Sequence, residues 1–202
     1  MSKDHWDNSF SEEDYVYGEE PNDFIREQAE RLPEHARISA FAEGEGRNAV
    51  YLAGLGHKVT AYDQSEVGLQ KACQLAERLN VRIETAAMDL TKEWVPAESA
   101  DAAIMVFGHV PKKSQPFLFE NLMQSVRPGG YLLFEVYSER QLEYGTGGPK
   151  EVKSLYDPAD LLKWLGPHDI LHFYYGEAVR HEGKRHTGTG HVIQGVIKKR
   201  MA

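Results

Sequence analysis

The chain has 202 residues, of which 41% are hydrophobic and 27% are charged, a composition typical of one globular domain with a large core. Its 23 basic and 31 acidic residues give a formal net charge of −8 at pH 7. This acidic balance argues against a nucleic-acid partner and against attachment to anionic membranes, because both need a basic surface. A single cysteine, Cys73, forms no internal disulfide and no thiolate metal centre, which predicts a reducing compartment.

The first twenty residues are polar and acidic, and they lack the apolar core of a secretory signal. No apolar run is long enough to cross a bilayer, so we expect a cytoplasmic protein. The same segment carries Trp6, Phe10, Tyr15 and Tyr17, and aromatic side chains usually cover another apolar surface. We therefore expect residues 1–36 to form a helical, aromatic cap on a single domain that spans residues 1–202.

Beyond residue 36, short apolar runs alternate with segments of helical periodicity. The apolar runs predict strands at residues 37–42, 57–62, 81–86, 102–107 and 131–137. Helices are expected at residues 48–55, after Ser65 as N-cap, and at residues 116–126. The helix after Ser65 is expected to bury one face, made of Leu69, Ala72, Cys73, Ala76 and Leu79. This alternation predicts a doubly wound parallel sheet with helices on both faces, and a ligand-binding core at residues 37–137.

The last third of the chain has a different pattern. A short helix at residues 159–165 follows Pro158, and two strand-like stretches follow at residues 170–179 and 191–198. Only the polar segment 180–190 separates them, so we expect an antiparallel hairpin at the edge of the sheet. The predicted fold class is therefore α/β, with five parallel strands and a C-terminal antiparallel hairpin, seven strands in all.

A glycine-rich loop follows the first strand. Gly44, Gly46 and Ala49 match the pattern G-x-G-x-x-A between a strand and a helix, where a ligand can approach the backbone closely. Asp63 ends the second strand, 19 positions after Gly44, where a carboxylate can accept both hydroxyls of a ribose. Asp89 follows the third strand. The pattern predicts a nucleotide-like ligand at the carboxyl ends of these strands.

The charges on the loop favour one kind of ligand over another. Glu43 and Glu45 would repel a pyrophosphate, whereas they would attract a sulfonium and an ammonium group. This favours S-adenosylmethionine over NAD as the cofactor. The glycine spacing and Asp63 also permit an NAD-linked oxidoreductase, which stays open as an alternative.

Several stretches together carry a family resemblance. They are residues 6–7, 15–22, 44–48, 59–65, 89–90, 127–130 and 144–149. On these stretches the chain resembles the class I S-adenosylmethionine-dependent methyltransferases, specifically the group related to the tellurite-resistance methyltransferases. The resemblance implies a single Rossmann-like domain whose seven-stranded sheet ends in an antiparallel hairpin.

The resemblance also implies which residues contact the cofactor. The loop backbone would hold the methionine portion, Asp63 the ribose, and Asp89 with its neighbours the adenine. Tyr15 and Tyr17 would close over the methionine end or the acceptor, or they would hold the N-terminal segment against the domain by hydrophobic contact. Phe107, at the end of the fourth strand, is expected to pack beside the cofactor. The expected cofactor-binding residues are Tyr17, Ala42, Glu43, Gly44, Gly46, Asp63, Gln64, Met88, Asp89, Leu90 and Phe107.

The chain departs from the family at the end of the first strand. The family usually has Asp-Leu-Gly-Cys-Gly there, and this chain has Ala40, Phe41, Ala42, Glu43 and Gly44. The acid that normally organises the loop is therefore absent. Either Glu43 compensates for it from a neighbouring position, or the cofactor affinity is reduced. A non-catalytic adenosyl-ligand binding or sensing protein therefore stays open as an alternative.

Methyl transfer from a sulfonium is an in-line displacement, so alignment supplies much of the acceleration, and a base is needed only for a protonated acceptor. His109, Arg180 and His186 are the candidate catalytic residues. His109 follows the fourth strand and can act as a base, or it can shape its loop. Arg180 and His186 are expected to form a cationic pocket for a small, soft or anionic acceptor, although Arg180 can equally pair with Glu177.

Two further features complete the predicted site. Gln141, Tyr144 and glycines 145, 147 and 148 suggest either a hinged lid over the acceptor or a connecting loop, within a lid, helix and hairpin region at residues 138–202. The histidines at positions 181, 186 and 191 are spaced so that neighbours lie on opposite faces of the hairpin, so we expect no metal site.

Overall fold

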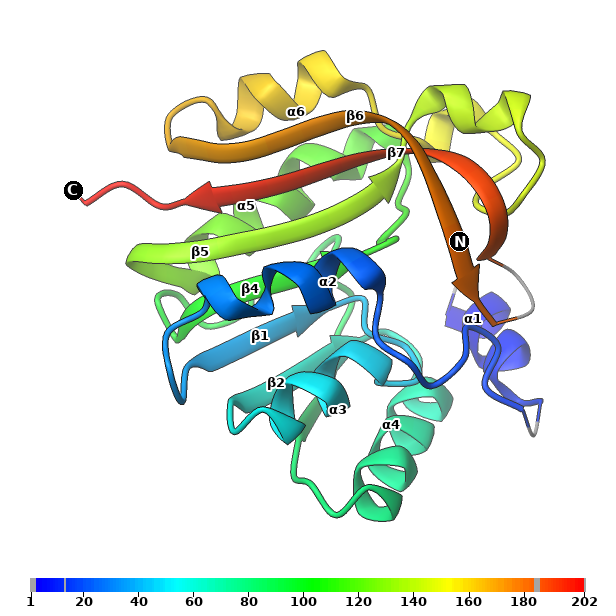
Figure 1. The fold of residues 1–202 in the computed structure, drawn as a ribbon, viewed down its shortest axis with the longest axis vertical. Helices are drawn as coiled ribbons and strands as arrows, with labels where there is room; N and C mark the ends of the chain where they lie inside the picture. Colours follow the sequence, from blue (N-terminus) through cyan, green and yellow to red (C-terminus); the bar gives the residue numbers. More distant parts are fainter. Residues whose placement is uncertain (1–2, 13, 184–185, 202) are drawn as a thin grey trace.

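A seven-stranded sheet in the order β3-β2-β1-β4-β5-β7-β6 forms the centre of the computed structural model, which describes residues 3–12, 14–183 and 186–201 (Figure 1). The strands from β1 to β5 are parallel to one another, whereas β7 pairs antiparallel with both β5 and β6. The strands are β1 Arg37–Phe41, β2 Lys58–Asp63, β3 Glu84–Ala87, β4 Ala100–Val106, β5 Val126–Tyr137, β6 Asp169–Glu182 and β7 His186–Lys198. The predicted fold class is confirmed.

Helices cover both faces of the sheet, with α2, α3 and α4 on one face and α5 and α6 on the other (Figure 1). The α-helices are α1 Lys3–Phe10, α2 Asp23–Gln28, α3 Arg47–Gly54, α4 Glu66–Arg78, α5 Gln115–Ser125 and α6 Pro158–Leu165. Short 3-10 turns occur at Ala29–Arg31, Lys112–Ser114, Glu139–Glu143 and Val152–Ser154. None of the helices in the described part of the chain has the length and apolar character that spanning a membrane would require.

The central strands bury side chains on both faces, as expected for a parallel sheet covered by helices. Phe41 and Met105 belong to the core under α5 and α6, whereas Ile38 and Ile104 belong to the core under α2 and α3. All four are at most 2% exposed. This two-sided burial explains why β4 is apolar at almost every position.

The predicted apolar face of α4 is only partly correct. Leu69, Ala72 and Ala76 are buried as expected, and Leu75 completes the buried face. Leu79 is 55% exposed, and Cys73 is half-buried rather than in the core. The physical reason is that α4 ends at Arg78 with Leu79 as its C-cap, so Leu79 lies where the chain turns away from the sheet.

The C-terminal hairpin is longer than expected. The prediction placed a polar turn at residues 180–190, but β6 continues to Glu182 and β7 begins at His186, with these two residues paired across the hairpin. Polar residues of this part of the chain are buried in the folded protein, namely Arg180, Glu182, His186 and His191. Lys184 and Arg185, which belong to the predicted turn, lie outside the described residues.

Candidate functional site

A cavity of about 1370 Å³ lies at the carboxyl ends of β1, β2, β3 and β4. It exceeds the ~300–1,000 Å³ usual for a small-molecule pocket, so it has room for two small molecules side by side. All the expected cofactor-binding residues except Gly46 line it, and so do His109 and His186, whereas Arg180 does not. The cavity also receives Lys3, Trp6 and Phe10 from α1, residues 145–150, and Thr187 from the hairpin.

The loop between β1 and α3 is held in a left-handed conformation. Ala42, Gly44 and Gly46 have φ angles of 51°, 58° and 88°. At Gly46 an added Cβ would lie 2.4 Å from the Cβ of Ala72, so only glycine allows the loop to contact α4. Ala42 stands where the family has glycine, and it adopts a conformation that costs an L-residue ~1–2 kcal/mol.

Glu43 caps the helix that follows the loop. Its Oε1 accepts a hydrogen bond of 2.7 Å from the Ala49 N–H, because the N-cap residue Gly46 has no side chain to do so. Burial raises the pKa of Glu43 to about 7, against the opposing effect of that hydrogen bond and of the nearby Arg47. Glu43 therefore places a carboxyl group on the cavity wall at the N-terminus of α3.

Glu45 points away from the cavity. Its Oε2 accepts a hydrogen bond of 2.8 Å from the Val16 N–H, and its Oε1 lies 2.5 Å from Lys71 Nζ. The carboxylate thus ties the N-terminal segment to α4. Of the two loop acids, only Glu43 lines the cavity.

Asp63 connects the glycine loop to the start of α4. Its Oδ2 accepts from the Gly44 N–H at 2.9 Å, and its Oδ1 accepts from the Ser65 N–H at 2.8 Å. Burial raises the pKa of Asp63 to about 6, although these main-chain bonds favour the charged form. Each carboxylate oxygen retains a second lone pair for a ligand hydroxyl.

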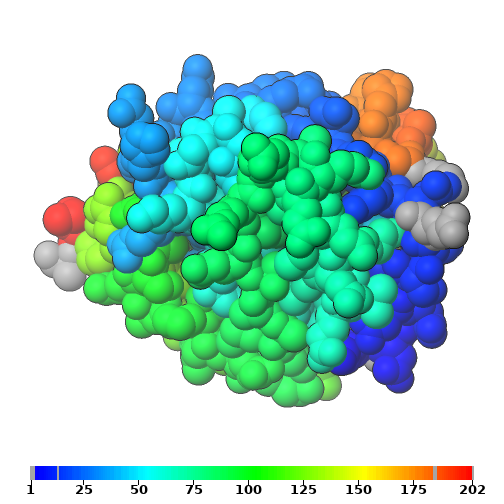
Figure 2. Space-filling view, turned by 90° about the horizontal axis from the view of Figure 1, so that it is seen from below, coloured from blue at the N-terminus to red at the C-terminus, as the bar shows by residue number. Residues whose placement is uncertain are grey.

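Helix α1 packs over this loop. The ring of Phe10 lies 2.9 Å from the position of an added Cβ on Gly44, and Trp6 stacks on Phe10 with ring centroids 5.5 Å apart. Lys3 forms an ion pair with Glu66 of α4 at 3.0 Å. Figure 2 shows the N-terminal segment against α4 on the molecular surface. Helix α1 therefore forms one wall of the cavity.

Tyr15 and Tyr17 have different surroundings. The Tyr15 hydroxyl donates to the Lys71 carbonyl at 3.0 Å and its ring packs on α4, outside the cavity. Tyr17 lines the cavity, and its ring centroid lies 4.6 Å from that of His186. Of the two tyrosines considered for closing over a ligand, only Tyr17 is placed beside one.

Asp89 anchors the loop after β3. Its Oδ1 accepts from the main-chain N–H and the hydroxyl of Thr91, and its Oδ2 accepts from Lys92 Nζ at 2.6 Å. Its neighbours Met88 and Leu90 give this end of the cavity an apolar surface. The arrangement suits a flat, largely apolar group with one polar edge.

His109 is held by the main chain on both sides of its ring. Nδ1–H donates to the Ser154 carbonyl at 2.8 Å, and Nε2 accepts from the Tyr137 N–H at 3.3 Å. Burial lowers the pKa of His109 to about 4, against the hydrogen bond to Ser154. The geometry therefore favours the loop-shaping role over that of a base.

Phe107 presents an aromatic face near the end of β4. It has a φ of 53°, an unusual conformation for a bulky residue, and such strain concentrates at functional sites. Its ring stacks on Tyr137 with centroids 4.4 Å apart and meets His186 edge-on at 4.5 Å. Phe107, His186 and Tyr17 form an aromatic wall of the cavity.

Arg180 is buried in an ion-pair network behind that wall. It binds both carboxylate oxygens of Glu135, with Nε 2.8 Å from Oε1. Glu182 lies 3.7 Å from the same Nε and binds Arg47 at 2.6 Å. The two arginines and two glutamates balance in charge, and the predicted partner Glu177 instead accepts from Tyr144. The structure therefore does not bring Arg180 to the cavity.

The glycine-rich loop at residues 145–150 forms another cavity wall. Gln141 holds it from behind, because its Nε2 donates to Thr146 Oγ1 and to the Gly147 carbonyl, both at 3.2 Å. Its Oε1 accepts from the His191 N–H at 2.7 Å. Gln141 thus joins the loop to β7.

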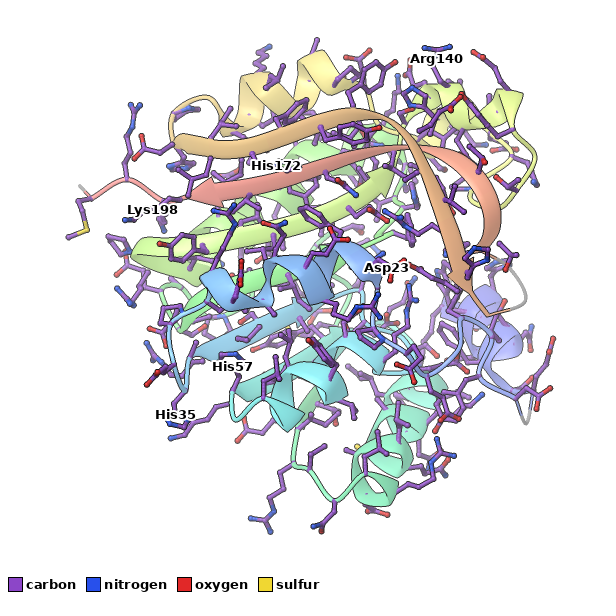
Figure 3. The ribbon with its side chains drawn as sticks, in the orientation of Figure 1. Asp23, His35, His57, Arg140, His172 and Lys198 are labelled. Atoms are coloured by element: carbon purple, nitrogen blue, oxygen red, sulfur yellow. The ribbon has the colours of Figure 1, made fainter. Side chains whose placement is uncertain are left out.

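The remaining histidines lie elsewhere. Figure 3 shows His35 and His57 at the amino-terminal rim of the sheet, and His172 packs against Phe24 of α2. His191 shares a hydrogen bond with Ser138 Oγ. Within residues 3–12, 14–183 and 186–201, no group of three or more His, Cys, Asp or Glu side chains is placed to hold a metal ion.

Sequence reasoning missed the acidic members of the network. Glu135 is fully buried in β5, where it stands alone among apolar residues. A single charge in an apolar strand is itself a signal, because such a residue needs a buried partner. Arg180 was itself a candidate residue in the sequence. Its pairing with Glu135 could not be predicted, because the two residues lie on different strands that only the folded sheet brings together.

Comparisons with known proteins agree with this architecture. Residues 38–130 match the model of a methyltransferase domain family. Over 92 residues the chain is 30% identical to the probable S-adenosyl-L-methionine-dependent methyltransferase TehB from two strains of Haemophilus influenzae, covering 45% of this chain and 32% of that protein. The chain thus spans about a third of the length of these curated relatives.

Solved structures show the same fold. The crystal structure of TehB from Haemophilus influenzae aligns with a TM-score of 0.74 at 18% identity, covering 89% of this chain and 63% of that one. The N-methyltransferase NodS from Bradyrhizobium japonicum, crystallised with S-adenosyl-L-homocysteine, aligns with a TM-score of 0.73 at 13% identity, covering 98% of each chain. The predicted resemblance to methyltransferases of the tellurite-resistance group is confirmed.

Proposed function

We propose that this chain, whose residues 38–130 carry a methyltransferase domain, transfers a methyl group from S-adenosylmethionine to a small-molecule acceptor. The observation that carries the proposal is the carboxyl group of Glu43 at the N-terminus of α3. A dinucleotide places its pyrophosphate at such a helix N-terminus. Here the Ala49 N–H is already bound by Glu43, so an anion is disfavoured and a cationic ligand is favoured.

The residues present fit the cofactor. S-adenosylmethionine supplies an activated methyl group on a positively charged sulfur. Glu43 and the main chain of the glycine loop would hold its cationic methionine end, and Asp63 would accept from the ribose hydroxyls. Met88, Asp89 and Leu90 would hold the adenine, and Phe107 would pack beside the sulfur-bearing end. Glu43 would then replace the acid that the family usually has at the end of the first strand, where this chain has Ala40 and Ala42.

The acceptor is proposed to be small and soft or anionic, and to bind next to the aromatic wall. The cavity is large enough for both substrates at once, as an in-line displacement requires. The charge balance of Arg180 favours the soft, polarisable alternative, because its positive charge is already compensated by Glu135. The aromatic rings of Tyr17 and Phe107 suit the same kind of acceptor.

Calorimetric titration of the purified chain tests the cofactor assignment. We expect S-adenosylhomocysteine to bind, and Asp63→Asn to weaken binding at least tenfold, because Asn lacks one of the acceptors that hold the loop and the ligand. Asp101→Asn is the matched control, since Asp101 also accepts from a main-chain N–H, that of Arg37, but at the opposite end of the sheet. It is expected to leave the affinity unchanged.

Two other outcomes would assign a different function. If NADH protects the chain against thermal unfolding and S-adenosylhomocysteine does not, the chain is an NAD-linked protein. If S-adenosylmethionine binds tightly but no labelled methyl group passes to any component of a metabolite extract, the chain is an adenosyl-ligand sensor. The strained backbone conformation of Ala42 is the feature of the structure that favours the second outcome.

A further inference from the structure

We propose that His186, which lies beside the Glu182 carboxylate, accepts a proton from the methyl acceptor, and that the acceptor is an aromatic hydroxyl or thiol, protonated in its free form at neutral pH. This inference rests on the proposed function and names the substrate class of the same site. It follows from the position of His186 in the cavity, from the carboxylate beside it and from the rings around it.

The first step is the placement of the imidazole. His186 is the first residue of β7, lines the cavity and is only 6% exposed. The hairpin that carries it reaches over towards α1 (Figure 1). At Gly183 an added Cβ would lie 2.5 Å from the carbonyl carbon of Tyr17 and from the Val16 oxygen, so the hairpin tip is fixed directly against the N-terminal segment. His186 is thus held beside Tyr17 by backbone contact.

The second step is the carboxylate behind the ring. Glu182 faces His186 across the hairpin, with Oε2 4.0 Å from Nδ1. The carboxylate is itself fixed, because Oε2 binds Arg47 Nη2 at 2.6 Å and Oε1 accepts from Asn22 Nδ2 at 2.8 Å. The distance to Nδ1 is too long for a hydrogen bond, so the carboxylate acts on the imidazole through its negative charge.

The third step is the electrostatic setting of His186. Among the described residues, the titratable and charged groups around it are Glu182 on β6, Tyr17 in the N-terminal segment and Tyr137 on β5, with Arg47 and Arg180 behind Glu182. Burial raises the pKa of Tyr137, which therefore stays uncharged. Glu182 is the only anion of this group in contact with His186, so the imidazolium would share its negative charge with Arg47.

The fourth step is the shape of the subsite. The rings of Phe107 and Tyr17 lie 4.5 and 4.6 Å from the His186 ring, and Val110, Pro111 and Pro149 continue the apolar lining. Aromatic groups pack on such surfaces in stacked or edge-on geometry. The subsite therefore suits a flat aromatic acceptor whose nucleophilic atom reaches the imidazole.

The step balances as follows. The oxygen or sulfur of the acceptor forms a bond to the methyl carbon, the carbon–sulfur bond of the donor breaks, and its electron pair returns to the sulfur, which becomes neutral. The proton of the acceptor passes to Nε2 of His186, and the resulting imidazolium lies beside the Glu182 carboxylate. The proton returns to solvent after the product leaves.

The kinetic test compares two acceptors of similar shape with the intact chain: a phenol that is neutral at pH 7, and a halogenated phenol that is ionised at pH 7. We expect His186→Gln to lower kcat about 100-fold or more for the neutral phenol and less than threefold for the ionised one. Equal losses on both acceptors would overturn the base assignment. If the wild-type chain binds no S-adenosylhomocysteine, the proposed function fails instead.

A second readout needs no turnover. NMR titration of the histidine ring signals in the S-adenosylhomocysteine complex follows the pKa of His186, which His186→Gln assigns. Glu182→Gln is expected to lower that pKa by about one unit or more, because it removes the adjacent negative charge. Glu177→Gln is the matched control, since Glu177 faces His191 in the same hairpin and its charge acts on that histidine. A His186 pKa that is unchanged by Glu182→Gln would overturn the proposal.

Discussion

Three buried titratable residues define the cavity wall, and each of them binds the main chain. Glu43 caps α3, Asp63 joins the glycine loop to α4, and His109 bridges the Ser154 carbonyl and the Tyr137 N–H. Burial shifts the pKa of each towards its neutral form, raising those of the acids and lowering that of the histidine. A cationic ligand would lower the pKa values of Glu43 and Asp63 again, because a nearby positive charge favours the ionised carboxylate.

The lowered pKa of His109 predicts how stability depends on pH. A histidine at about 4 in the folded chain and at ~6.5 when unfolded stabilises the fold fully above pH 6.5, and this stabilisation is lost as the pH falls towards 4. Between pH 7.5 and pH 5 the loss amounts to about 2 kcal/mol. Over that pH range we expect the free energy of unfolding of His109→Gln, measured with urea, to shift relative to that of the wild type by this amount in favour of the variant.

The wild type must be compared with His109→Gln because Glu43 and Asp63 change the stability in the opposite direction to His109 as the pH falls. Their raised pKa values make the fold more stable as the pH falls from about 7, and this gain exceeds the loss from His109, so the wild-type curve alone does not reveal that loss. His181→Gln removes an exposed histidine and controls for the substitution itself. Parallel pH curves for the wild type and His109→Gln would mean that the pKa of His109 is the same in the folded and the unfolded chain, which would contradict the prediction.

The regular elements were predictable because their signals are local. The parallel strands have short apolar runs, and the helices begin at recognisable caps, as with Ser65, whose side chain accepts from the Gly68 N–H. Leu79 was misplaced because helical periodicity does not say where a helix ends. The hairpin was predicted too short because Arg180 and Glu182 look like turn residues until their buried partners are known.

The part of the site that lies at strand ends was also predictable from the sequence. Gly44, Asp63 and Asp89 lie at strand ends, and the parallel topology alone brings strand ends to one edge of the sheet. Whether a polar side chain faces the cavity or the main chain depends on contacts between distant segments. Glu45 and Arg180 were expected at the ligand, but they bind Lys71 and Glu135 instead.

The contact between the hairpin tip and the N-terminal segment predicts a large effect of one methyl group. Gly183 has a φ of 62° and lies against the backbone of Val16 and Tyr17, so Gly183→Ala adds left-handed strain and a clash with atoms that cannot rotate away. We expect a loss of about 2–4 kcal/mol in urea unfolding, with faster amide exchange of Tyr17 and Gly18.

Gly54→Ala is the matched control for that substitution. Gly54 is the last residue of α3 and has no atom near an added Cβ, so alanine is expected to stabilise the chain by about 0.5–1 kcal/mol. Unfolding curves for Gly183→Ala that coincide with those of the wild type would mean that the hairpin tip is not held against residues 16–18.

At the scale of the whole molecule, one polar network joins the two ends of the chain over the sheet. Glu135 on β5 accepts from Asn22 near the N-terminus, from Arg180 on β6 and from Gln194 on β7. Asn22 also donates to Glu182, and its N–H donates to Asn48 of α3. The cavity therefore depends on segments that are far apart in sequence and that this network helps to bring together.

Removing one charge of the Glu135–Arg180 pair should lower the free energy of unfolding far more than removing both charges. Glu135→Met leaves the Arg180 charge buried without its bidentate partner, and we expect a loss of about 3–5 kcal/mol in urea unfolding. In the double variant with Arg180→Met, two apolar side chains replace the pair, and at least half of that loss should be recovered. Asp169→Asn, which breaks the exposed pair of Asp169 with Arg200 on the same hairpin, is expected to cost at most about 1 kcal/mol. Additive losses in the double variant would instead mean that the two charges do not depend on each other, and that the closure over the cavity rests on apolar packing alone.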